Sequence, residues 1–141
     1  MKYRLLLILL FATTLGATAR HSMATGSNAK GDDEKHVYMF GFAISFKDSV
    51  VYVTDIQRVA PVTWERRTHL LSRRANYSEQ LRYHLNNQGL TDRTITVMYD
   101  KKKKKVEKRL RKLQRRYTQK RNYEWKVVDA TAFTFTPAKE E

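Results

Sequence analysis

The alternation of hydrophobic and polar positions predicts a pair of strands near the start of the folded part of the chain. Over residues 36–46 large apolar side chains occupy every second position and smaller ones lie between them, as in a strand covered on both faces. Lys47 and Asp48 interrupt this run, and β-branched residues follow over 49–56. The two runs and the short polar break between them predict a β-hairpin.

A four-residue spacing of apolar side chains predicts a helix later in the chain. Residues 76–79 match a capping box, in which the first side chain bonds the third amide and the last side chain reaches back. The apolar face of this helix consists of Tyr77, Leu81 and Leu85, and Gly89 supplies the left-handed residue that ends it. Before this helix and after Pro61, residues 63–73 predict a shorter helix.

Two further strands flank a strongly charged helix. Residues 94–99 and 123–128 are rich in β-branched and aromatic side chains and predict strands, the second of which Phe133 and Phe135 could extend. Between them, residues 101–119 predict a helix. Its apolar stripe is spaced by four, three and four positions and consists of Val106, Leu110, Leu113 and Tyr117.

Together these elements predict an α+β fold in the order strand, strand, helix, strand, helix, strand. We expect a two-layer sandwich, in which a four-stranded mixed sheet carries its helices on one face, because short strand–helix–strand connections form right-handed crossovers between parallel strands. The predicted core lies between the sheet and the helices and contains Phe40, Phe42, Ile44, Leu81, Leu85, Leu110 and Leu113.

The first residues of the chain, 1–19, predict a signal peptide. Lys2 and Arg4 precede a largely apolar run over 5–15, and residues 17–19 (Ala-Thr-Ala) fit the small-x-small cleavage pattern. An apolar run of this length covers only about half of the bilayer core, so a cleaved signal is favoured over a permanent transmembrane helix. We therefore expect export to the periplasm or out of the cell.

The rest of the chain divides into three parts. Residues 20–35 are rich in small and polar side chains without periodicity and predict a flexible leader. Residues 36–136 form the predicted single domain, and residues 137–141 form a C-terminal tail. No second apolar run of spanning length follows the signal, so no transmembrane segment is expected after cleavage.

The charge of the chain is concentrated in one segment. The sequence has 28 Lys and Arg against 14 Asp and Glu, a formal net charge of +14. Thirteen of the basic residues lie within 101–121, where Glu107 is the only acidic residue. The remainder of residues 20–141 carries equal numbers of acidic and basic side chains. The net charge of residues 20–141 therefore lies entirely in the predicted helix over 101–119 and the two residues that follow it.

This concentration favours the binding of a polyanion over a merely solvated helix face. Solvated faces usually mix charges, because like charges four positions apart repel, and the helix macrodipole disfavours the lysines at the start of this helix. An exposed, solubilising face is the other interpretation. Since the apolar stripe should pack on the sheet, the expected contact residues are Lys101, Lys104, Lys105, Lys108, Arg111, Lys112 and Arg115.

Several polyanions fit an exported protein. Anionic lipid headgroups, lipopolysaccharide phosphates and acidic glycans suit that location. Nucleic acid is a weaker candidate, because no helix-turn-helix, zinc-finger, RRM or KH signature is present. The aromatic residues near the helix, Tyr117 and Trp125, are expected to be core residues and not base-stacking platforms. The pattern identifies no protein partner.

Catalytic and metal-binding chemistry finds little support in the sequence. The absence of cysteine excludes thiol nucleophiles and Cys-ligated metals, and the histidines at 21, 36, 69 and 84 lack metal-ligand spacing. Asp48, Asp55 and Asp129 lie at strand ends and could approach one another, but no paired geometry follows from their spacing. We therefore expect no catalytic residue, metal or cofactor; a small hydrolase is the remaining enzymatic alternative.

Three features together carry a resemblance: the predicted export signal, the segment 76–81 (Asn-Tyr-Ser-Glu-Gln-Leu), and the Lys-rich helix before a Tyr-containing strand. In these the chain resembles small uncharacterised exported proteins of Bacteroides-type bacteria. The resemblance implies a periplasmic or surface location and no particular activity. The sequence therefore favours an exported module that binds an anionic envelope or extracellular polymer. The alternative is an envelope protein that meets a protein partner through its sheet face or hairpin edge.

Overall fold

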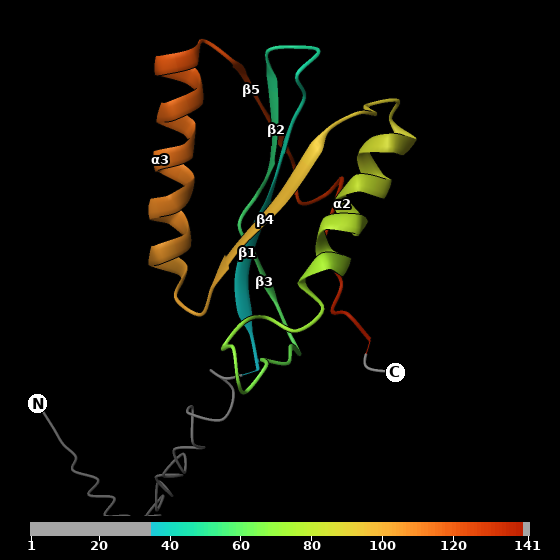
Figure 1. Cartoon of the computed structure of the whole chain (residues 1–141), viewed down its shortest axis with the longest axis vertical. Coiled ribbons are helices and arrows are strands. Elements are labelled where there is room, and N and C mark those ends of the chain that lie inside the picture. The colour runs from blue at the N-terminus through green and yellow to red at the C-terminus, as the bar shows by residue number, and fades with distance from the viewer. Residues whose placement is uncertain (1–34, 140–141) are drawn as a thin grey trace, which may run out of the picture.

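The computed structural model describes residues 35–139, which form a sheet with a helix on either side (Figure 1). The elements in chain order are β1 (Val37–Ile44), β2 (Val50–Thr54), β3 (Gln57–Val59), α2 (Arg74–Asn87), β4 (Thr94–Asp100), α3 (Lys103–Arg121) and β5 (Glu124–Val128). The α+β class, the mixed sheet and the order of the predicted elements are as expected. The predicted signal peptide and nearly all of the predicted leader lie outside the described residues.

Strand β1 is the centre of the sheet. It pairs antiparallel with β2, β3 and β4, and β2 pairs in parallel with β5. The β4 ladder runs along residues 38–44 of β1 and overlaps both other ladders, so β2 and β3 must share the opposite edge of β1. The order across the sheet is therefore β4, β1, β2 with β3, and β5.

The predicted second strand is split in two by one extra residue. Phe42 pairs with Val53 and Met39 pairs with Gln57, so three steps along β1 correspond to four steps along its partner. This offset is the signature of a β-bulge. At the bulge a side-chain hydrogen bond replaces one between backbone groups: the Thr54 hydroxyl oxygen accepts a 2.9 Å hydrogen bond from the amide of Gly41. The sheet thus has five strands, two of which continue one another.

The two helices lie on opposite faces of the sheet, and the expectation that both cover one face was wrong in this respect (Figure 1). Side chains alternate along β1, so Val37 and Met39 point toward α2 while Phe40 and Phe42 point toward α3. Two hydrophobic clusters result, one under each helix. The structure accordingly has three layers: helix, sheet, helix.

The direction of the two crossovers explains this arrangement. Strands β2, β3 and β4 each run antiparallel to β1, and β5 runs parallel to β2. Helix α2 therefore connects the parallel strands β3 and β4, and α3 connects the parallel strands β4 and β5. The first connection crosses β1 toward β4, and the second returns across β1 and β2 to β5. Two right-handed crossovers that travel in opposite directions must use opposite faces of the sheet.

Helix α2 ends as predicted but begins differently. The Gly89 φ angle of +75° and the bond from the Leu90 amide to the Leu85 carbonyl (3.0 Å) form the expected left-handed stop. The prediction of a capping box at residues 76–79 is wrong, because the helix already begins at Arg74 and no side chain caps it. The short helix predicted over 63–73 is absent as well. That segment is a loop closed by a bridge between Trp64 and Leu71.

Helix α3 covers the other face with its apolar stripe. Val106 and Leu113 are buried against Phe40, Phe42, Val51 and Val53, while Leu110 and Tyr117 are half-buried there. Of the predicted core residues, Ile44 and Leu110 are half-buried and the other five are buried. Asp100 lies two residues before the N-terminal cap and accepts a 3.0 Å hydrogen bond from the Lys102 amide.

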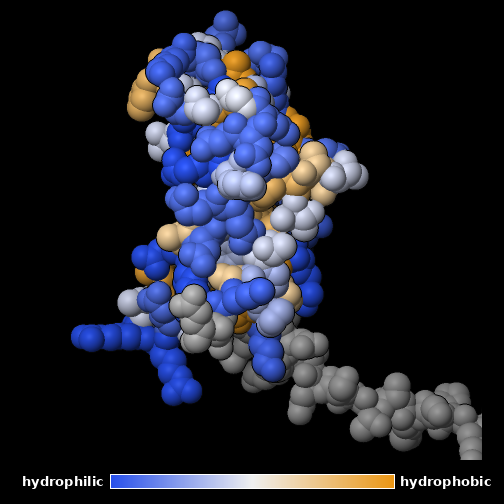
Figure 2. All heavy atoms as spheres, turned by 90° about the vertical axis from the view of Figure 1, so that its right-hand side faces the viewer, coloured by the Kyte–Doolittle hydropathy of each residue, from blue (hydrophilic) through white to orange (hydrophobic). Residues whose placement is uncertain are grey.

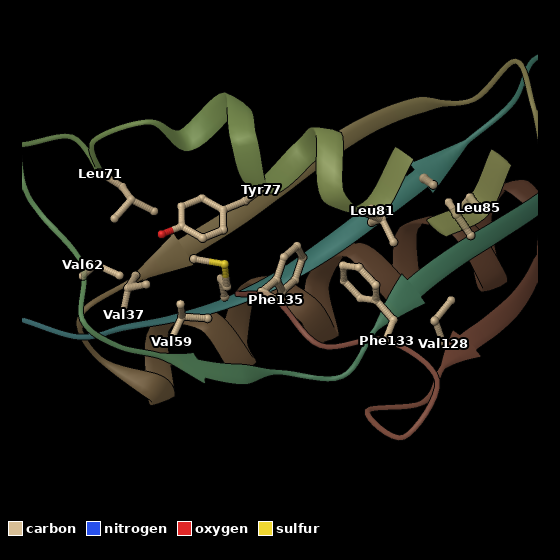
Figure 3. Packing of buried hydrophobic residues seen from close by; sticks show 12 residues of the cluster. Val37, Val59, Val62, Leu71, Tyr77, Leu81, Leu85, Val128, Phe133 and Phe135 are labelled. Atoms are coloured by element: carbon tan, nitrogen blue, oxygen red, sulfur yellow. The ribbon is translucent and has the colours of Figure 1, made fainter. Parts of the chain in front are cut away.

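The C-terminal segment completes the cluster under α2 without forming a strand (Figure 3). Phe133 and Phe135 are buried beside Tyr77, whose ring lies 6.2 Å from that of Phe135. The buried amide of Gln57 donates to the Phe133 carbonyl (2.9 Å) and accepts from the Phe135 amide (2.7 Å). Gln80 on α2 holds the next residue, Thr136, in the same way. Two glutamine side chains therefore take the place of a neighbouring strand.

Candidate polyanion-binding surface

The outer side of α3 and the residues just before it present the predicted contact residues to solvent. Every one of them is exposed: Lys101, Lys104, Lys105, Lys108, Arg111, Lys112 and Arg115. At 3.6 residues per turn, Lys104, Lys108, Arg111 and Arg115 lie opposite the stripe that packs on the sheet. These four residues form a basic row that runs along the helix. The structure thus brings the predicted residues onto one continuous surface, which we call the basic face.

The basic face continues around one flank of α3 toward β4. Lys105 and Arg109 lie on this flank, and both approach Asp100: the Arg109 guanidinium at 3.3 Å and the Lys105 ammonium at 3.9 Å. Arg109 also donates a 2.7 Å hydrogen bond to the Tyr99 carbonyl. Asp100 is the only acid that pairs with a side chain of α3 in the described part of the chain, since Glu107 forms no ion pair there. The charge of the helix is therefore largely uncompensated.

A shallow hollow lies between long side chains near the C-terminal end of the helix. It has a volume of about 360 Å³ and is lined by Lys112, Arg115, Arg116, Gln119 and Lys120. Four of these five residues are cationic. The hollow is therefore a place where a phosphate, sulfate or carboxylate group meets several charged donors at once.

The aromatic residues next to α3 belong to the core, as expected. Tyr117 packs on Phe42 with a ring separation of 5.2 Å and on Tyr123 with one of 5.4 Å. Trp125 is half-buried against the same cluster. These rings support the helix from beneath. A base-stacking platform beside the basic face would have to be formed by other residues.

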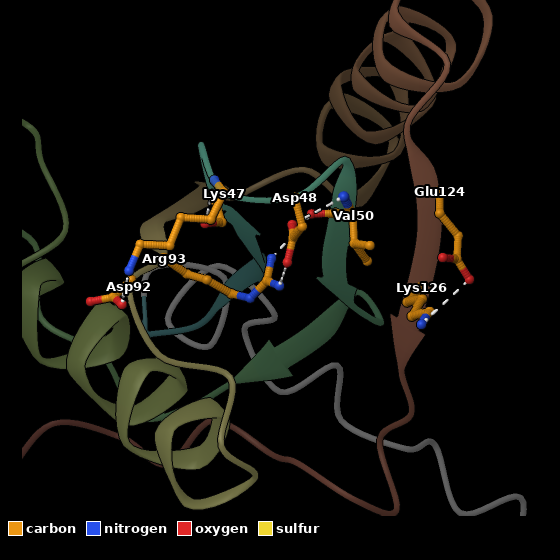
Figure 4. A network of polar contacts seen from close by, with 8 residues as sticks. Lys47, Asp48, Val50, Asp92, Arg93, Glu124 and Lys126 are labelled. Atoms are coloured by element: carbon orange, nitrogen blue, oxygen red, sulfur yellow. Dashed lines mark hydrogen bonds and ion pairs between the residues drawn. The ribbon is translucent and has the colours of Figure 1, made fainter.

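Of the acidic residues at the strand ends, Asp55 and Asp129 follow paired residues of β2 and β5, whereas Asp48 lies at the other end of β2. Asp48 pairs with the buried guanidinium of Arg93, which also donates to the Val50 carbonyl at 3.1 Å (Figure 4). Asp55 accepts a hydrogen bond from the Ala130 amide at 3.1 Å. The pKa of Asp129 is lowered by the hydrogen bond that it accepts from the Thr131 amide. Within residues 35–139 no group of acidic and histidine side chains is arranged to hold a metal ion.

A second ion pair reinforces the same end of the sheet. Lys47 at the hairpin turn binds Asp92 in the loop before β4, with 2.5 Å between Nζ and Oδ2 (Figure 4). Lys47 holds the pKa of Asp92 below its ordinary value, first through this hydrogen bond and then through its charge. Together with Arg93, this contact ties the tip of the hairpin to the entrance of β4.

Sequence reasoning missed an aromatic pocket at the start of α3. The pocket has a volume of about 590 Å³ and is lined in part by Trp64, Leu70, Tyr99, Lys101 and Arg109. Its walls come from the loop over 63–73, from the end of β4 and from α3. Because residues more than thirty positions apart meet there, no local spacing in the sequence could have indicated it.

The remaining surface is a weaker candidate for a binding site. The side of the molecule that carries α2 is mainly hydrophilic, with hydrophobic side chains visible only in small areas (Figure 2). Among the residues described, no helix combines the length and apolar character needed to cross a bilayer.

Comparison of the chain with known protein families, curated proteins and solved structures found no match.

Proposed function

We propose that the protein is an exported binding module whose basic face on α3 holds an anionic polymer. The part of the proposal that concerns export rests on the predicted signal peptide. It assigns polymer contact to the row Lys104, Lys108, Arg111 and Arg115, with Lys101, Lys105 and Lys112 beside it. No reaction is part of the proposed function.

The observation that carries the proposal is the uncompensated charge of the outer side of α3. Like charges three or four positions apart repel, and the five consecutive lysines at 101–105 oppose the positive end of the helix dipole. A helix that served only as a solvated face would gain stability from acidic partners on the same face, and here none is present in the described residues apart from Asp100 and Glu107. A bound polyanion would remove this repulsion.

Salt dependence is the first test of the proposal. Affinity for a phosphate polymer or heparin would come mainly from the release of counterions, so it should fall linearly with salt on logarithmic axes. For about five engaged cations we expect a slope of about −4 to −5. The measurement is fluorescence anisotropy of a labelled heparin chain over a range of salt concentrations.

A charge-reversed variant separates binding from folding. Lys108→Glu with Arg115→Glu places each new carboxylate three or four positions from cations, so the thermal midpoint should stay equal or rise while heparin binding is lost. The matched control reverses Arg82 on α2 and Lys139 in the C-terminal segment beside it, which lie on the other side of the sheet from α3 and give the same net charge. Equal binding by both double variants would contradict the proposal.

The alternative function, an envelope protein with a protein partner, has a narrower surface in this fold. Both faces of the sheet are covered by helices, and both long edges of the hairpin are paired with other strands. What remains is the hairpin tip, where Phe46 is 95% exposed. Capture of a partner that survives high salt and is lost in Phe46→Ser would favour this alternative.

A further inference from the structure

The aromatic pocket adjoins the basic face and shares two of its cations. Both Lys101, which lies just before α3, and Arg109, which lies on the flank of α3 that faces β4, line it. A polymer that follows the basic face toward the start of α3 therefore reaches the pocket. The inference below rests on the proposed function and concerns the kind of polymer that the basic face holds.

The pocket combines an aromatic corner with cations that are already oriented. The rings of Trp64 and Tyr99 lie 6.0 Å apart at an angle of 58°, and the Lys101 ammonium lies 4.9 Å from the centre of the Trp64 ring. Arg109 is held in place by the Tyr99 carbonyl and by Asp100. Leu70, which is 38% exposed, adds an apolar wall. Preorganised groups of this kind bind a ligand with little loss of side-chain freedom.

We infer that this pocket binds one sugar ring of an acidic polysaccharide, with the ring against Trp64 and Leu70 and its charged substituent between Lys101 and Arg109. The volume of about 590 Å³ lies in the range of small-ligand sites and exceeds what a bare phosphate or sulfate requires. A linear phosphate polymer would leave the apolar walls without a partner. The ligand must therefore carry both a ring and a charge.

Two features favour a sugar over a nucleotide base. The Lys101 ammonium lies over the Trp64 ring, 4.9 Å from its centre, so a ligand ring packed in this corner can present a directly attached anion to it. Acidic sugars carry carboxylate or sulfate on the ring itself, whereas a nucleic acid carries its charge on the backbone, one sugar away from the base. Asp100 also lines the pocket, and a carboxylate can accept more than one hydrogen bond, including one from a sugar hydroxyl.

The second feature is the angle between the two rings. At 58° they form a corner and not a slot with parallel walls, so a flat base could stack on only one of them. The corner instead suits a puckered ring, which presents C–H groups to one aromatic face and hydroxyl groups to the other side. The shape of the pocket and its polar groups therefore point to the same class of ligand.

The two tryptophans of the chain allow a direct test. Trp64 lines the pocket and Trp125 supports α3, so the variant Trp125→Phe reports on the pocket alone and Trp64→Phe reports on the other side of the sheet. Each variant is titrated with a heparin-derived tetrasaccharide, with an oligo-dT of similar charge and with inorganic polyphosphate. Binding is followed independently by calorimetry, and the thermal midpoint confirms that each variant is folded.

We expect the tetrasaccharide to produce a saturable change in the Trp64 emission of Trp125→Phe, and polyphosphate to bind without one. Binding of the tetrasaccharide with no change at Trp64 would overturn the inference and leave the proposed function standing. An equal change with oligo-dT would overturn the assignment to a sugar. Absence of binding by all three probes would refute the proposed function as well.

A charge placed in the pocket provides a second readout. Leu70→Glu should weaken tetrasaccharide binding by roughly tenfold, because the new carboxylate repels the acidic ring, and should change polyphosphate binding by less than about twofold. The matched control, Tyr83→Glu, makes the same kind of exchange at an exposed position of α2 with the same number of added charges. If both variants weaken the tetrasaccharide equally, the effect is one of net charge and the pocket is not the site.

Discussion

Gly41 shows how one residue determines the distance between a helix and the sheet. A Cβ atom at this position would lie 2.3 Å from Leu81 Cδ2 and 3.2 Å from Phe135 Cζ. Leu81 is almost completely buried and cannot move away freely. The glycine therefore allows α2 and the C-terminal segment to pack directly on the backbone of β1.

Replacing this glycine should destabilise the protein although alanine is the better strand residue. We expect Gly41→Ala to lower the free energy of unfolding by about 1–2 kcal/mol, because overpacking outweighs the gain in backbone entropy. In a Leu81→Ala background the same change should be nearly neutral or stabilising. Urea denaturation of the four proteins in this double-mutant cycle measures the coupling; an additive result would show that the two residues do not interfere.

At the scale of single elements, α3 rests on the sheet through only part of its apolar stripe. Leu113 is 8% exposed, whereas Leu110 is half-buried at the border of the cluster. The stripe is narrow because polar and charged side chains occupy both flanks of the helix. Its contribution to stability should therefore be unequal along its length.

We expect Leu113→Ala to lower the free energy of unfolding by about 2–4 kcal/mol and Leu110→Ala by about 1–2 kcal/mol. The difference follows from the cavity that each truncation leaves, which is larger at the buried position. Thermal and urea unfolding of the two variants provide the comparison. Equal losses would mean that α3 packs more deeply at Leu110 than the structure indicates.

Local spacing along the chain was sufficient to predict most elements and the basic face. Tyr77, Leu81 and Leu85 identify α2 because helical periodicity is local, and the exposure of Lys108 follows from the stripe on the other side of α3. The choice of sheet face for each helix depends on strand order, which no local pattern encodes. The aromatic pocket likewise depends on Trp64 meeting Tyr99 across thirty-four intervening residues.

At the scale of the whole molecule, the C-terminal segment is as much a part of the core as the sheet. Phe133 and Phe135 are buried in the cluster under α2, and Ala138 packs against it with its amide bonded to the Tyr77 hydroxyl. The two glutamines that hold this segment differ in exposure, since Gln57 is buried and Gln80 is half-buried. Loss of the Gln57 side-chain amide leaves the Phe133 carbonyl and the Phe135 amide without these hydrogen bonds.

Gln57→Ala should therefore lower the free energy of unfolding by about 2 kcal/mol or more, and Gln80→Ala by less than about 1 kcal/mol, since water can replace the second amide. Hydrogen exchange at the Phe135 amide should become faster in Gln57→Ala, because its acceptor is removed. An unchanged exchange rate there would show that another acceptor takes the place of the glutamine.

This placement of the C-terminal segment has a consequence for how the protein forms during synthesis. The strands and helices described here are complete once Val128 has been made, yet the cluster beneath α2 still lacks two phenylalanines and the contacts that Gln57 and Gln80 make with residues 133–136. Until those residues emerge, apolar side chains such as Tyr77 and Leu81 stay open to water on one side. Folding of the domain is therefore completed by the last part of it to be made, and a chain without residues 133–136 leaves the cluster beneath α2 open.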